Sequence, residues 1–186
     1  MGGPPVSPYQ PGADLWRESN TMSPAYHQST GKDLHRRSLY SVWKRTAPLP
    51  NMQAFDAPSR EVCTVARGRT NTPLQALVLL NDVQFVEAAR GVASQVSQHH
   101  SDLNGQIDEA FMLLTGRHPD AAELSLLSDL YNEQSSLFAD AVTQNPTEFL
   151  GEGEAKSESK LSPANLAALT VVCQAILNLD ATIYER

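Results

Sequence analysis

Hydrophobic residues recur at intervals of three and four between about residues 73 and 180, which is the spacing of one face of an α-helix. Three sites along this stretch place a capping side chain, with or without a proline, where a first turn would begin: Thr72-Pro73, Asp82 and Ser162-Pro163. Pro119-Asp120 is a fourth place where a helix is expected to open. Gly116 follows the third apolar segment and is suited to end a helix. We therefore expect helices at 73–80, 82–98, 103–115 and 120–138, and a last one that begins at 163.

Each expected helix has an apolar face that we expect to be buried. For the first helix this face consists of Leu74, Leu77, Val78 and Leu80. For the last helix it consists of Leu166, Leu169, Val172, Cys173, Ile176 and Leu177. Residues 146–162, which hold two glycines and a polar run, are expected to form a solvated loop.

Two segments precede this helical region. Residues 1–31 are rich in proline and glycine, so we expect an extended arm that lacks regular structure and lies against a partner surface. Residues 32–46 have apolar side chains near helical spacing, which favours a helix capped by Asp33 and ended by Pro48 and Pro50. A short strand is expected at 62–65.

The expected fold is mainly α: an irregular multi-helix bundle, residues 32–186, with an extended Pro/Gly-rich N-terminal arm, residues 1–31. Hydrophobic residues make up 41% of the 186 positions, which is enough for a core. The longest apolar runs are too short to span a bilayer, and no signal peptide is visible at the start.

Charge is unevenly distributed along the chain. The net charge of −7 argues against a nucleic-acid binder, which needs a broad basic face. Residues 32–69 hold eight Lys or Arg and three acids, a charge of +5, whereas residues 71–186 hold five and sixteen, a charge of −11. The basic stretch is either an anion site or a segment that packs on the acidic part, and the second reading needs no partner.

The loop at 51–72 is the chemically densest part of the chain. Guanidinium, amide and hydroxyl groups converge there just before a proline-started helix, an arrangement that can bind sulfate, phosphate or carboxylate. The candidate anion- or ligand-binding residues are Arg60, Cys63, Arg67, Arg69, Asn71, Thr72 and Gln75. The alternative is that the same groups anchor the loop to backbone carbonyls and to carboxylates such as Asp56, Glu61 or Asp82.

The cysteine and histidine residues give only weak indications of a functional site. Cys63 lies among arginines, which favours a reactive thiolate, although a free cysteine is more often a buried small apolar side chain. Spacing does not support a bridge from Cys63 to Cys173, and without a CxxC motif the chain has neither a zinc ribbon nor covalent haem. His35 and the pair His99-His100 indicate metal only weakly, so no metal site is assigned.

Three aromatic residues near basic side chains could stack on sugar rings, although core packing explains them more often. They are Trp16, Tyr40 and Trp43.

Several segments together are similar to a known family. They are 33–40 (DLHRRSLY), 43–48 (WKRTAP), 55–64 (FDAPSREVCT) and 69–82 (RTNTPLQALVLLND), with further agreement around Thr115-Gly116-Arg117 and at 175–180. They resemble a planctomycete domain of unknown function that closes large secreted proteins with cytochrome-c-like regions. The resemblance covers most of the chain from about Gly3.

The resemblance implies that this chain is the C-terminal part of a larger family domain, at the end of a periplasmic or secreted protein. Its partners would be the upstream domains of the same protein, where haem c is the implied cofactor; none is assigned to this chain. No catalytic residues carry over from the family. We expect a structural or interaction domain; the alternative is that the arginine loop contributes an anion- or anionic-saccharide-binding site to an extracytoplasmic redox or polysaccharide-processing enzyme.

Overall fold

The computed structural model describes residues 3–10, 12, 26–44, 47–59, 61–66, 68, 70–140, 144–156 and 158–183. The described residues are mainly helical and contain no strand, which confirms the expected mainly-α class of helical bundle. The elements, in chain order, are η2 (Gly31–His35), η3 (Ser38–Tyr40), α1 (Pro50–Ala54), α2 (Pro73–Asn81), α3 (Val83–His99), α4 (Leu103–Thr115), α5 (Ala121–Ala139), α6 (Pro146–Phe149), α7 (Pro163–Leu177) and α8 (Asp180–Ile183). The chain divides into two compact units, Met1–Val78 and Leu79–Arg186.

The helix expected at 32–46 is replaced by two short 3₁₀ helices, η2 and η3. The break comes at Arg36 and Arg37, whose ψ angles of 150° and 144° are extended. Apolar side chains in this segment do not share one face, because Leu34 is buried while Leu39 is exposed. Asp33 is not the cap of η2; its carboxylate instead lies 3.5 Å from the Arg36 guanidinium.

The described part of the N-terminal arm is extended and pairs with the segment after η3. Val6 donates its N–H to the Tyr40 carbonyl at 2.9 Å and accepts from the Val42 N–H at 2.8 Å, which makes a parallel bridge between Val6 and Ser41. The Val6 side chain is buried. The arm therefore packs on its own unit as far as it is described; the Trp16 region lies outside the described residues.

Pro50 begins helix α1 instead of ending the preceding one. Proline is well suited to the first helical position, because its missing N–H has no intrahelical partner there. Residues 62–65, expected as a strand, are irregular, with bends at Val62 and Val65, and both valines are exposed.

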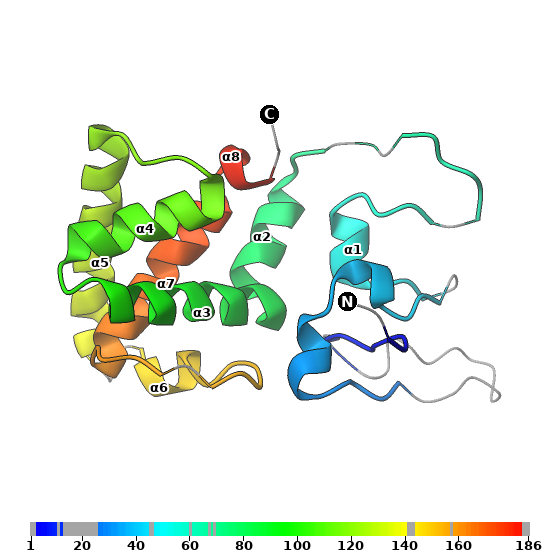
Figure 1. Cartoon of the computed structure of the whole chain (residues 1–186), viewed down its shortest axis with the longest axis horizontal. Coiled ribbons are helices and arrows are strands. Elements are labelled where there is room, and N and C mark those ends of the chain that lie inside the picture. The colour runs from blue at the N-terminus through cyan, green and yellow to red at the C-terminus, as the bar shows by residue number, and fades with distance from the viewer. Residues whose placement is uncertain are drawn as a thin grey trace. The chain divides into compact units, whose positions relative to one another are not determined.

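Helix α7 is the centre of the second unit. It packs against α3, α4, α5 and α6, and its contacts with α3 and α5 are the most extensive. Figure 1 shows α7 running behind α3 and α4 toward α8. The side chains that form the core between these helices are mostly aliphatic: Ala89, Ala93, Val96, Ile107, Ala110, Phe111, Leu127, Leu166, Leu169, Val172, Cys173 and Ile176.

Helix ends in this unit follow the local signals in the sequence. The carboxylate of Asp82 and the hydroxyl of Ser162 each accept a hydrogen bond from a backbone N–H of the first turn, as expected, and the carboxylate of Asp120 does the same at the start of α5. Asp120 and Glu123 form a complete capping box. Gly116 ends α4 with a φ of 76°, the left-handed conformation that favours glycine.

The buried face of α2 differs from the expected one. Leu74 and Leu77 are 58% and 57% exposed, and Leu80 is exposed as well. Gln75 and Leu79, one helical turn apart, are the buried side chains. Because apolar residues occupy most positions of α2, their spacing does not select one face, and hydrogen bonds of Gln75 decide the orientation instead.

The segment at 146–162 is not a solvated loop throughout. It contains the short helix α6, and its 150–155 part is fastened to α3 by Arg90, which is 2% exposed. The guanidinium donates to the carbonyls of Leu150, Glu152 and Ala155 at 2.5, 2.5 and 2.6 Å. Further along α3, Ser94 and Gln98 donate to the Glu158 carbonyl.

Replacing Arg90 with methionine should destabilise the second unit. The Arg90→Met variant keeps an apolar stem but leaves three carbonyls without their donor, so we expect the free energy of unfolding to fall by about 3 kcal/mol. Urea unfolding followed by far-UV circular dichroism measures this change. Lys156→Met, an exposed cation in the same loop, is the control and should change stability by less than about 0.5 kcal/mol. Equal effects of the two substitutions would contradict the assigned role of Arg90.

Candidate functional site

The candidate loop connects α1 to α2 (Figure 1). Arg60, Arg67 and Arg69 lie outside the described residues, so the expected contacts of their guanidiniums with carboxylates stay a prediction. The structure describes the other four candidates. Cys63 and Asn71 are exposed, Thr72 is half-buried and Gln75 is buried.

Gln75 is the central side chain of this region. Its Oε1 accepts from the Thr72 N–H at 3.0 Å, and the Thr72 hydroxyl accepts from the Gln75 N–H at 3.4 Å. This reciprocal pair is a capping box, and the Thr72-x-x-Gln75 spacing could have identified it from sequence. Gln75 Nε2 donates to the Ala54 carbonyl at 2.8 Å and to the Thr70 hydroxyl at 3.1 Å. The carboxamide of Gln75 is therefore engaged within the protein at both its oxygen and its nitrogen.

Asp56, which follows α1 at the start of the loop, is hydrogen-bonded to Thr70 near the end of the loop. Its Oδ2 accepts from the Thr70 N–H at 2.8 Å and from the Thr70 hydroxyl at 2.7 Å. Asp56 has a φ of 55°, which places it in the left-handed region. Asp56, Thr70, Gln75 and the Ala54 carbonyl thus form a continuous hydrogen-bonded clamp, which we call the loop clamp, between the end of α1 and the start of α2.

The two cysteines are unpaired and lie in opposite environments. Cys173 is fully buried, and desolvation raises the pKa of its thiol to about 12, so the thiol stays protonated. Cys63 is exposed, which corrects the reading of this residue as a buried apolar side chain. No disulfide joins the two.

The histidine pair at the end of α3 contacts a carboxylate on α4. His99 Nδ1 lies 2.8 Å from Glu109 Oε1, and His100 Nε2 lies 3.1 Å from Glu109 Oε2. Among the described residues, no group of three or more histidine, cysteine or carboxylate side chains is arranged to hold a metal ion. The same residues include no helix long and apolar enough to cross a membrane.

The structure describes two of the three aromatic candidates. The guanidinium carbon of Arg36 lies over the Tyr40 ring, 5.3 Å from the centroid of that ring. Trp43 is half-buried. Trp16 lies outside the described residues.

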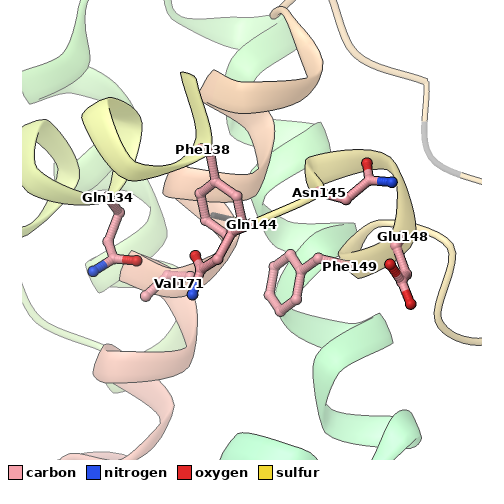
Figure 2. Close-up of a pocket in the computed structure, with 7 residues that line it drawn as sticks. All are labelled: Gln134, Phe138, Gln144, Asn145, Glu148, Phe149 and Val171. Atoms are coloured by element: carbon pink, nitrogen blue, oxygen red, sulfur yellow. The ribbon is translucent and has the colours of Figure 1, made fainter. Parts of the chain in front are cut away.

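A pocket with a cavity volume of about 440 Å³ lies in the second unit, between α5, α6 and α7, and sequence reasoning missed it. Figure 2 shows the Phe138 and Phe149 rings near each other, with the Gln144 side chain running below the Phe138 ring toward Val171. The described residues that line it are Gln134, Phe138, Gln144, Asn145, Glu148, Phe149 and Val171. Residues from three separate segments make this site, so no single motif could have indicated it.

The loop clamp predicts a measurable loss of stability on substitution of Gln75. Gln75→Met keeps the side-chain volume but removes the hydrogen bonds to Ala54, Thr70 and Thr72, so the first unit should lose about 2 kcal/mol. Both tryptophans lie in residues 1–78, so tryptophan fluorescence during urea unfolding reports on this unit. The exposed Gln95→Met on α3 is the control; an unchanged midpoint for Gln75→Met would show that the clamp contributes nothing.

Comparison with known proteins identifies the family of the chain. No curated protein and no solved structure matches the sequence. A family model described as PSD1, protein of unknown function (DUF1553), matches residues 1–131. The match covers the N-terminal arm, the candidate loop and helices α1 to α4, and it ends within α5. The chain therefore belongs to the PSD1 family of proteins of unknown function (DUF1553).

Proposed function

We propose that this chain is a structural and interaction domain that completes a larger extracytoplasmic protein. The loop clamp is the observation that supports this proposal. Gln75 and Thr72, two of the candidate ligand-binding residues, direct their polar groups at each other, at Thr70 and at the Ala54 carbonyl. Polar groups that are already hydrogen-bonded inside the protein are poorly suited to bind a ligand, because the ligand would have to displace them.

The setting of the domain rests on the family resemblance of the segments 33–48 and 55–82. In that setting the partners are the upstream domains of the same planctomycete protein, and haem c is bound by one of those domains. The protein is periplasmic or secreted. No residue of this chain is proposed to hold the haem.

The alternative function is binding of an anion or an anionic saccharide by the arginine loop. It is supported by the basic character of residues 32–69, whose charge is +5, and by the exposure of Asn71 at the start of α2. The two functions differ in what an added anion does to the stability of the first unit.

Thermal unfolding in sulfate separates the two functions. For a structural loop, sulfate should raise the melting temperature of the wild type and of Arg69→Lys by the same amount, because sulfate stabilises folded proteins generally. Sodium chloride at matched ionic strength is the control, and tryptophan fluorescence is the readout. Saturable protection at about 1 mM sulfate or below that is lost in Arg69→Lys would overturn the structural function.

The setting is tested on the full-length protein in its native cells. An antibody against residues 79–186 should detect a protein larger than 20.3 kDa in the periplasmic or secreted fraction. The pyridine haemochrome spectrum of the immunopurified protein should show haem c. A cytoplasmic protein of this chain's own mass, without haem, would contradict the proposed setting.

A further inference from the structure

The pocket between α5, α6 and α7 combines an apolar floor with a polar rim. Phe138, Phe149 and Val171 form the floor, and the two rings lie 5.5 Å apart between centroids at a tilt of 32°. Gln134, Gln144, Asn145 and Glu148 form the rim. Figure 2 shows the Gln134 and Gln144 carboxamides near Val171, and the Glu148 carboxylate at the opposite edge of the site, farther from Phe138 than the Phe149 ring is.

The electrostatics of this pocket favour a cation. Glu148 supplies a carboxylate, and the described residues that line the pocket include no lysine, arginine or histidine. The C-terminal end of α5, a helix of 19 residues, lies at Phe138 and has no basic residue in its last turn, so its carbonyl dipoles also favour positive charge. Residues 79–186 hold five lysines and arginines against sixteen aspartates and glutamates, a charge of −11, so the surrounding field has the same sign.

The apolar floor of the pocket favours a ligand that also carries an alkyl chain. Aromatic faces attract a cation, and aliphatic and aromatic floor atoms are covered best by methylene groups. Asn145 Oδ1 already accepts from the Thr147 N–H at 3.0 Å, which leaves the carboxamide oxygens of Gln134 and Gln144 as the neutral acceptors of the rim. Lysine matches this pattern, because a flexible alkyl stem carries a compact ammonium group with three donors.

We propose that this pocket binds a lysine side chain of a partner protein, with the alkyl stem on Phe138, Phe149 and Val171 and the ammonium group toward Glu148. The inference rests on the proposed interaction function and names the chemistry of the partner. It concerns the second unit alone and does not involve the arginine loop.

The test is a titration of the full 186-residue chain with Nα-acetyl-lysine amide, followed by isothermal calorimetry and by NMR of the Phe138 and Phe149 rings. We expect saturable binding with a Kd of about 1 mM, at least about tenfold tighter than binding of the neutral isostere Nα-acetyl-norleucine amide. n-Butylammonium tests for a free amine as the ligand and should bind no more tightly than the lysine amide.

Matched variants locate the binding. Glu148→Gln removes the rim charge and Phe149→Leu removes a ring while keeping an apolar side chain; each should weaken binding about fivefold or more. Glu133→Gln removes an exposed carboxylate of α5 that does not line this pocket, and it should leave the Kd within about twofold. Far-UV circular dichroism confirms that each variant keeps its helices.

Three results would overturn the proposal. The first is that the norleucine amide binds as tightly as the lysine amide, and the second is that Glu133→Gln weakens binding as much as Glu148→Gln. The third is that n-butylammonium binds more tightly than the lysine amide, which would make a free amine the ligand. Failure here is distinguishable from failure of the proposed function. Saturable sulfate protection lost in Arg69→Lys affects the first unit, whereas loss of lysine binding concerns only the pocket of the second.

Discussion

The buried guanidinium of Arg90 holds the second unit together at a point where no regular secondary structure can do so. It donates to three carbonyls of the 150–155 segment, which connects α6 to the start of the central helix α7. A charged group this deeply buried must be hydrogen-bonded, because leaving it unpaired costs several kcal/mol. The path of the 150–155 segment over α3 therefore depends on this guanidinium.

The backbone of the same loop is adapted to that path. Gly153 has a φ of 81°, and a Cβ atom there would lie 2.9 Å from the carboxylate of Glu87, so only glycine fits without displacement. The carboxylate of Glu87 in turn accepts from the Ala155 N–H. Glu87, Arg90, Ser94 and Ser97 follow one another at helical spacing along α3, and together they form a buried polar stripe that fixes the loop.

In both units, polar side chains thus form hydrogen bonds that hold a loop in place within the protein and are not directed at a ligand. In the first unit the loop clamp engages Asp56, Thr70, Gln75 and the Ala54 carbonyl, and in the second the α3 stripe engages the 150–159 segment. The pocket beside α6 differs, because Gln134, Gln144 and Glu148 line a concave space over two phenylalanine rings. This contrast supports the proposal that a partner binds at the pocket of the second unit.

Sequence alone determined the features that depend on contacts within one turn. The starts of α2, α3, α5 and α7 and the end of α4 were predictable, because a capping side chain acts on backbone groups two to three residues away and glycine adopts the left-handed conformation by itself. Tertiary structure decided the buried face of α2, the break between η2 and η3, the path of the 150–159 loop and the pocket. The bonds that set the loop path join residues 60 to 68 positions apart, and the pocket draws on residues from 134 to 171, so no local pattern could encode either.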